Sequence, residues 1–476
     1  MPSDLSNLSL AALSGMIRTR DVTSLAATDA CLDTIKAHNP AINAFVRIDA
    51  DCARQAAEAA DRDIAHGRWR GPLHGVPLAH KDMFYRMGET STCGSLILGE
   101  RRADRTAAVI ERLHAAGSVT VGWLNMAEFA AGPTGQNDHF GACRNPWNLD
   151  YISGGSSSGS GAAIAARCVY GSLGSDTGGS IRLPAGICGV TGLKTTYGRV
   201  SRYGAMPRCW TLDVVGPIAR SAEDCALILQ AIVGRDDRDS STVDMPVPNY
   251  LEALRLDLKG LTIGVPDNHF FPELEDAVRP MHNATLERLA DLGAKIMRFP
   301  MPDPTPLYRL TNLVNKAEAA ALHGRWIRER PQDYNLSTLA RIEAGFHIPA
   351  TAYIEALNLR PVILKDFTAA VFDQGCDVLY VPVLTGPVPT IAETTIAEAG
   401  AAEAIIDKIT RCTRWVSYLG LPGASFLCGF ANGLPVSAQL IGRPFSEHTL
   451  LGIIHAYQQV TDWHQARPEI KANLAG

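Results

Sequence analysis

Apolar and polar residues alternate along this chain with two periods, which predict strands and helices in turn. Short apolar runs of strand length occur at 76–79, 119–123, 261–265, 294–299, 378–383 and 434–441. Apolar residues that recur every three or four positions predict helices within 21–66 (the clearest at 51–66) and at 105–116, 162–170 and 274–292, and a final helix of about fifteen residues with Ser446 as its N-cap. Strands alternating with helices predict an α/β fold, with a large mixed or mostly parallel sheet covered by helices on both faces.

Composition is that of an ordinary soluble globular protein, because 46% of the residues are apolar and 20% are charged. A net charge of −5 argues against the basic face that nucleic-acid binding requires and against polybasic attraction to a membrane. The N-terminus shows no secretory signal, and no apolar run approaches the ~20 residues that span a bilayer. We therefore expect a cytoplasmic protein that binds neither nucleic acid nor membrane.

Cysteines and histidines give no sign of a disulfide framework or a metal site. The 11 cysteines are odd in number and are never spaced as C-x-x-C. The 13 histidines include no H-E-x-x-H or comparable ligand spacing, so a metal hydrolase is disfavoured. We expect neither a metal nor a cofactor.

A Gly/Ser tract at 153–161 has the composition of a flexible linker, but it leads straight into an apolar helix. It lacks the lysine of a phosphate-binding P-loop, and Ile164 breaks the dinucleotide fingerprint. The five residues from Gly155 to Gly159 satisfy the nucleophile-elbow pattern G-x-S-x-G, which would make Ser157 the nucleophile of an α/β-hydrolase-type esterase. A poor preceding strand counts against that alternative, which stays open at this point.

A second tract, 174–184, is expected to form a Gly-rich turn at 174–180, where the Gly178-Gly179 pair allows a tight turn with consecutive N–H groups pointing one way. Ser180 ends the turn, so its hydroxyl could attack a carbonyl whose oxygen rests on those donors. A structural turn with a helix-capping serine explains the same residues equally well.

Several motifs, in order, resemble the amidase signature family. They are Gly75-Val-Pro-Leu-Ala-His-Lys-Asp82, Arg144-Asn-Pro-Trp147, Gly154-Gly-Ser-Ser-Ser-Gly159, Asp176-Thr-Gly-Gly-Ser-Ile-Arg-Leu-Pro-Ala185, Cys188-Gly-Val-Thr-Gly-Leu-Lys194, Asp377-Val-Leu-Tyr-Val-Pro382 and Gln439-Leu-Ile-Gly-Arg-Pro444. The resemblance covers about residues 70 to 460 and implies the amidase signature fold. Thr195 stands where the family usually has proline, and Ser158 where many members have glycine.

The resemblance implies a catalytic set. Ser180 would be the nucleophile, Ser156 (held by a cis peptide in the family) the bridge, and Lys81 the base. Backbone N–H groups of the turn would form the oxyanion hole, and the backbone at one further residue would touch substrate. These residues are Thr177, Gly178 and Gly179 for the oxyanion hole and Ala130 for substrate contact. Lysine acts as a base only when neutral, so we expect Lys81 to be buried with a lowered pKa.

Three further residues of the signature are expected to be structural. Asp176 and Arg182 flank the turn and are interpreted as a buried pair, while Cys188 is expected to pack in the core. Ser157, if it is not a nucleophile, is expected to hydrogen-bond to backbone within its loop.

These observations predict a single-domain amidase, a hydrolase of linear amides, over residues 1–476. We expect N-terminal helices at 1–70, a catalytic core at 71–236, a variable cap-like segment at about 237–375 and the rest of the core at 376–476. The expected reaction cleaves a C–N bond of a small-molecule amide, carbamate, anilide or ester. The alternative is the A subunit of a glutamine-dependent tRNA amidotransferase, which needs a partner protein. The family resemblance is also compatible with a homodimer.

Overall fold

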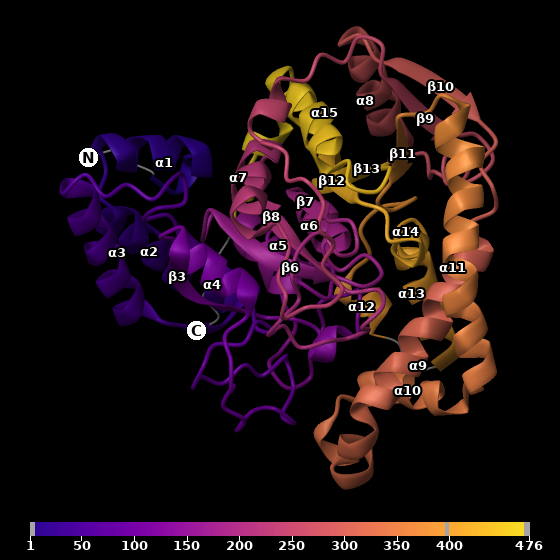
Figure 1. The fold of residues 1–476 in the computed structure, drawn as a ribbon, viewed down its shortest axis with the longest axis horizontal. Coiled ribbons are helices and arrows are strands. Elements are labelled where there is room, and N and C mark those ends of the chain that lie inside the picture. The colour runs from indigo at the N-terminus through magenta and orange to yellow at the C-terminus, as the bar shows by residue number, and fades with distance from the viewer. Residues whose placement is uncertain (1–4, 396–398, 471–476) are drawn as a thin grey trace.

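Eight strands form one mixed sheet through the middle of the molecule (Figure 1). The computed structural model describes residues 5–395 and 399–470. In spatial order the strands are β10 (Lys295–Phe299), β9 (Thr262–Pro266), β11 (Val378–Pro382), β13 (Leu434–Gly442), β12 (Gly423–Ala431), β7 (Thr191–Lys194), β8 (Val214–Ala219) and β6 (Gly171–Asp176). The first three are parallel, and every later pairing is antiparallel, so the predicted mixed sheet is confirmed.

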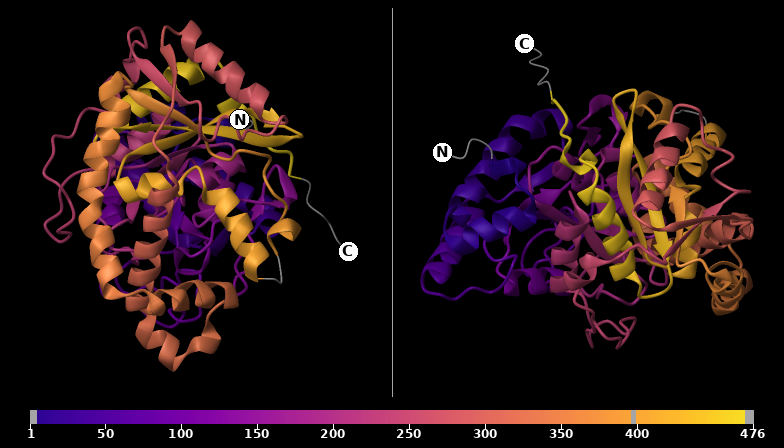
Figure 2. Two further views of the ribbon diagram at one scale, coloured as in Figure 1. Left: turned by 90° about the vertical axis from the view of Figure 1, so that its right-hand side faces the viewer. Right: turned by 90° about the horizontal axis from the view of Figure 1, so that it is seen from above.

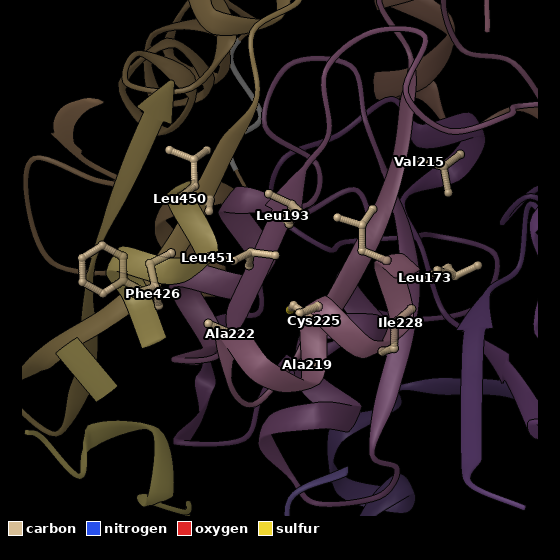
Figure 3. Packing of buried hydrophobic residues seen from close by; sticks show 14 of the residues in the cluster. Leu173, Leu193, Val215, Ala219, Ala222, Cys225, Ile228, Phe426, Leu450 and Leu451 are labelled. Atoms are coloured by element: carbon tan, nitrogen blue, oxygen red, sulfur yellow. The ribbon is translucent and has the colours of Figure 1, made fainter. Parts of the chain in front are cut away.

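Helices cover both faces of this sheet, as expected for strands whose side chains alternate between two buried faces. On one face, α7 (Ala222–Ile232) and α15 (Glu447–Gln459) pack against the strands, with Phe426, Leu450 and Leu451 in contact range (Figure 3). On the other face lie α5 (Ser158–Ala165) and α6 (Arg182–Cys188). A Cβ at Gly423 would stand 3.2 Å from Cδ of Arg182, which places that strand position against α6.

A second sheet of three strands lies beside the first, in the order β1 (Phe45–Ile48), β3 (Val119–Leu124) and β2 (Pro77–Lys81). It joins the large sheet at β6, where Leu173 N donates to His80 Nδ1 at 3.3 Å. Helices α1 (Leu10–Thr19), α2 (Ser24–Ile42), α3 (Ala50–Ala65) and α4 (Ala108–Ala115) lie around it, at the left in Figure 1. Strand β2 continues past the apolar run that predicted it, and Lys81 is its last residue.

Long helices dominate the far side of the molecule from α1–α3 (Figures 1 and 2). They are α9 (Thr305–Glu329), α10 (Leu336–Glu343) and α11 (Ala350–Val371), and α9 packs along α14 (Arg414–Leu419). The remaining helices are α8 (Arg279–Asp291), α12 (Ile391–Thr394) and α13 (Ala399–Thr410). The division into a single domain with a cap remains a prediction.

Two local predictions were wrong, and a third was right in position only. The helix expected at 162–170 begins inside the Gly/Ser tract and ends at Ala165, because Arg167 takes a left-handed φ of 61° that ends it. The Gly-rich segment at 174–176 belongs to strand β6 and not to a turn. Ser446 occupies the N-cap of α15 but donates its hydroxyl to Arg443 O and accepts nothing from the helix.

No helix in the described ranges combines the length and apolar character that crossing a bilayer requires.

Candidate active site

Lys81 and Ser156 are joined by a hydrogen bond at the centre of the molecule. Lys81 Nζ donates to Ser156 Oγ at 2.7 Å, and neither residue has exposed surface. Strand β2 delivers the lysine and the Gly/Ser tract delivers the serine. Ser156 follows a cis peptide bond after Gly155, as the resemblance implied.

Ser175 is a second partner of the lysine that sequence reasoning missed. Its Oγ accepts from Lys81 Nζ at 2.9 Å. It lies on β6 directly before Asp176, and the alternation of a strand turns the two side chains to opposite faces. That alternation was the available signal, but the Gly-rich sequence of β6 did not indicate a strand.

Burial lowers the pKa of Lys81 to about 7, although the negative charges of Asp213 and Asp176 act to raise it. The ammonium form loses its hydration in the interior, and no carboxylate lies in direct contact to compensate among the described residues. A neutral amine can therefore accept a proton near neutral pH. The expectation of a buried lysine with a lowered pKa is confirmed.

Ser180 lies at the end of a turn that Asp176 holds in shape. Gly179 N donates to Asp176 Oδ1 at 2.7 Å, and Ile181 N donates to Oδ2 at 3.3 Å. Gly179 has a φ of 133°, and a Cβ there would stand 2.3 Å from Thr413 Oγ1, so only glycine fits. Ser180 is partly exposed, and its hydroxyl has no hydrogen-bond partner within the described part of the chain. Ser180 is therefore partly accessible to solvent, whereas Lys81 is fully buried.

The oxyanion role expected of the amides in this turn stays a prediction, and the hydrogen bonds show which of these amides are free. The amide of Gly179 is committed to Asp176. The amides of Thr177, Gly178 and Ser180 have no acceptor in residues 5–395 or 399–470. In this conformation, the free donors of the turn are therefore these three.

Asp176 and Arg182 form the expected buried pair. Arg182 Nε lies 3.0 Å from Asp176 Oδ2, both side chains have no exposed surface, and Arg182 Nη1 donates to Gln439 Oε1 at 2.9 Å. Burial alone would raise the pKa of Asp176, but the charge and hydrogen bonds of Arg182 bring that pKa below its usual value. Asp176 is therefore an ionised anchor for the turn.

Asp213 supports the turn from its outer side, and sequence reasoning missed it. Thr177 Oγ1 donates to Asp213 Oδ1 at 2.6 Å, while Arg208 N and Cys209 N donate to Oδ2 at 2.7 and 2.9 Å. A lone aspartate in a segment without periodicity gave no signal. The loop that Asp213 closes contacts α9, where Thr211 Oγ1 donates to Glu318 Oε1 at 2.6 Å.

Ala130 lies next to the loop that carries Ser156, and its contact with substrate stays a prediction. Ala127 N donates to Ser156 O at 3.1 Å, which places the short helix η2 (Glu128–Ala130) beside the serine. Phe129 and Ala130 both have positive φ angles, of 47° and 57°. The segment is tied to the cap region, since Asn335 N donates to Glu128 Oε2 at 2.9 Å.

The structure also places Ser157 and Cys188. Ser157 has no exposed surface and donates to Ser175 O at 3.4 Å, so it binds backbone of β6 and not of its own loop. Lys81 contacts Ser156 and not Ser157, which weighs against the esterase alternative. Cys188 is buried, as expected. Within the described ranges, no three His, Cys, Asp or Glu side chains are grouped to hold a metal ion.

Comparisons with known proteins agree with this geometry. The family model Amidase matches residues 26–451. The A subunit of the glutamyl-tRNA(Gln) amidotransferase of Methylococcus capsulatus is 40% identical, over 96% of this chain and 98% of its own length. A solved structure from a vestigial protein complex, described as revealing the origins of an s-triazine catabolic enzyme, superposes with a TM-score of 0.89 and 33% identity, covering 98% of this chain and 100% of its own. The peptide amidase of Stenotrophomonas maltophilia gives a TM-score of 0.84 and 28% identity, covering 98% of each chain.

Proposed function

The chain belongs to the amidase family, and from that premise we propose that it cleaves a carboxamide C–N bond through an acyl-enzyme on Ser180. Ser156 relays the proton and Lys81 is the base. The observation that supports this proposal most directly is the buried Lys81–Ser156 hydrogen bond of 2.7 Å beside a partly exposed, unbonded Ser180 hydroxyl.

The proposed steps conserve protons without a histidine. Neutral Lys81 takes the proton of Ser156 as Ser156 takes the proton of Ser180, and Ser180 Oγ forms a bond to the carbonyl carbon. The resulting oxyanion receives hydrogen bonds from the free amides of the turn, which is the largest single stabilisation in such reactions. The proton returns through Ser156 to the nitrogen of the leaving group as the C–N bond breaks. Water then attacks the ester by the same route, and the acid leaves.

The test is direct detection of the acyl-enzyme. The purified chain is mixed with a panel of primary amides, including glutamine, and hydroxylamine is added to trap the acyl group as a hydroxamate. We expect a hydroxamate, and an acyl adduct on the peptide that contains Ser180 in mass spectra of quenched reactions. Ser180→Ala should remove both signals, whereas Ser157→Ala should keep them. An adduct on Ser157, or turnover that survives Ser180→Ala, would overturn the proposal.

A second question is whether the chain works alone. The relatives that are A subunits of glutamyl-tRNA(Gln) amidotransferases favour the amidotransferase role over a self-sufficient hydrolase, because their identity extends over nearly the whole chain. We therefore propose the amidotransferase role as the first assignment and the self-sufficient amidohydrolase as the second. Both use the same acyl-enzyme chemistry, and they differ in the fate of the ammonia.

Co-purification from the source cell decides between these assignments. An affinity-tagged chain that recovers a stoichiometric partner protein, and releases ammonia from glutamine far faster with it, supports the amidotransferase. A chain that elutes alone and turns over non-glutamine amides at full rate supports the self-sufficient hydrolase and rejects the first assignment.

A further inference from the structure

Arg208 carries a buried guanidinium for which the described residues provide no hydrogen-bond acceptor. The residue is 5% exposed, and its Nε and Nη1 atoms are shielded from solvent without a hydrogen bond. No carboxylate within the described residues lies in ion-pair range of it. Burying an uncompensated charge is costly, so a cation in this position needs a reason.

The position of Arg208 links it to the candidate active site. Its own backbone N–H donates to Asp213, the residue that holds Thr177 of the oxyanion turn. The oxygens of Asp213 accept from Thr177 Oγ1 and from the amides of Arg208 and Cys209, and no hydrogen bond among the described residues joins Asp213 to the guanidinium. The adjacent Cys209 contacts Glu318 of α9 at 3.1 Å, so the loop lies against that helix.

A second arginine approaches the same turn. A Cβ at Gly178 would stand 3.4 Å from Cγ of Arg414, and Arg414 Nη1 donates to Asn312 Oδ1 of α9 at 2.6 Å. The positive charge of Arg414 helps to lower the pKa of Arg208, after the larger effect of burial. Two cations thus approach the turn that carries Ser180. Arg414 lies 3.9 Å from Asp407, so Arg208 is the one of the two for which the described residues provide no carboxylate in ion-pair range.

Two polar atoms on α9 have no hydrogen-bond partner among the described residues. They are His323 Nε2 and Asn315 Oδ1, and both are shielded from solvent. Asn312 and Asn315 share one face of the helix by their spacing. Burial, followed by the charge of Arg208, lowers the pKa of His323 to about 3, so this ring is a neutral neighbour of the arginine. Burying polar atoms without partners is costly, so this part of α9 is better matched to a polar ligand than to an apolar one.

We infer that Arg208, supported by Arg414, binds a carboxylate carried by the substrate, so that the enzyme acts on amides with an anionic acyl group, such as monoamides of dicarboxylic acids. A carboxylate supplies the acceptor oxygens that the guanidinium lacks, and an arginine fork suits a carboxylate in bidentate geometry. This inference rests on the proposed function, since it names the substrate class of the same site.

Binding tests the inference without turnover. Calorimetry compares succinate and glutarate with their neutral diamides on the Ser180→Ala chain. We expect the dicarboxylates to bind roughly 10- to 100-fold more tightly, the contribution of a hydrogen bond to a charged group. The double variant Ser180→Ala/Arg208→Met should lose this preference, Arg208→Lys should keep part of it, and Arg325→Gln on the exposed face of α9 should keep all of it. Equal affinity for acid and diamide on the Ser180→Ala chain overturns the inference.

Thermal unfolding separates recognition from a structural role. Removing an unpaired buried charge should leave the melting temperature of Arg208→Met equal to or above that of the parent when no ligand is present. A structural arginine would instead lower it by several degrees, and that result overturns the inference. Turnover of succinamate against succinamide then tests both proposals separately. If succinamide is hydrolysed through Ser180 as fast as succinamate, the inference fails and the proposed function stands. If succinate binds through Arg208 but no acyl adduct forms on Ser180 from succinamate or from glutamine, with any co-purified partner present, the proposed function fails alone.

Discussion

Thr177 donates its hydroxyl to Asp213 Oδ1 at 2.6 Å, which ties the turn that carries Ser180 to the loop that packs against α9. Asp176 holds the same turn from the inner side through the amide of Gly179. The turn is therefore held between two buried carboxylates, and its free amides are fixed before substrate arrives. Fixed donors are what electrostatic stabilisation of an oxyanion requires, since they need no reorganisation during the reaction.

Asp213→Asn should reduce the rate and shift its pH dependence. The asparagine can still accept from Thr177, but its amide nitrogen cannot accept from the amides of Arg208 and Cys209, so we expect the turn to be less well fixed. The charge of Asp213 also raises the pKa of Lys81, so its loss should lower that pKa and move the acid limb of kcat/KM to lower pH by about 1 unit or less. The measurement is kcat/KM against pH for both proteins. If Asp213→Asn lowers the rate but leaves the acid limb at the same pH, the predicted effect of the Asp213 charge on the pKa of Lys81 is wrong.

The pH dependence of the parent follows from the pKa of Lys81, which burial lowers to about 7. The base acts when neutral, so kcat/KM should rise roughly tenfold per pH unit below about 7 and level off above it. A profile flat from pH 5 to 10 would exclude Lys81 as the base.

Lys194 offers a matched control for this profile. It is buried, its pKa is also lowered by burial to about 7, and it donates to Leu421 O at 2.7 Å, away from Ser156. When kcat/KM is normalised to the amount of folded protein, Lys194→Met should show the same acid limb as the parent. Lys81→Met should lose the activity itself.

Ser156→Ala and Ser157→Ala make a pair of neighbouring substitutions with opposite expectations. Ser156 accepts from Lys81, so its removal should lower kcat by about 10²–10⁴, the range of general acid–base contributions. Ser157 donates only to the carbonyl of Ser175, at 3.4 Å, so its removal should change kcat little and stability by about 1 kcal/mol. Single-turnover rates and urea unfolding of both variants provide the measurements. Equal losses of kcat would show that the two serines act as one structural unit.

The sequence predicted the parts of the site that lie in recognisable motifs. Lys81, Ser156 and Ser180 each belong to such a motif, and the structure brings the first two into contact. The alternation of helices with apolar strands was enough to predict the α/β class. Antiparallel neighbours such as β7 and β12 pair across more than 200 residues of sequence, as Lys194 and Gly423 do, so their order could not be read from local periodicity.

Sequence analysis missed three residues of the site, and for each the reason is the lack of a periodic pattern that would assign its side chain to a face. Ser175 lies on a strand whose glycines and serines are not typical strand residues, so nothing indicated which way its side chain points. Asp213 and Arg208 lie in an irregular loop, where no period assigns a face. Each is noticed only through its surroundings in three dimensions. Asp213 accepts from the turn that carries Ser180, and Arg208 has no acceptor among the described residues.

Arg182→Met should destabilise the fold at neutral pH, because it leaves Asp176 buried without its cation. We expect a loss of about 3–5 kcal/mol in the free energy of unfolding. Arg182 lowers the pKa of Asp176 in the parent, so the stability from this pair is present above the unfolded pKa and is lost as pH falls through the folded one.

The pH dependence of that loss separates the ion pair from simple packing. Without the arginine, burial raises the pKa of Asp176, so the penalty should be largest at pH 7 and should shrink on acidification as the carboxyl binds a proton. Urea unfolding at pH 7 and at pH 4.5 measures the change. The double variant Asp176→Asn/Arg182→Met should recover part of the stability at pH 7, and Arg325→Gln, which breaks an exposed pair, should change it little at either pH. A loss equal at both pH values would mean that Arg182 stabilises the fold by filling space and not by its charge.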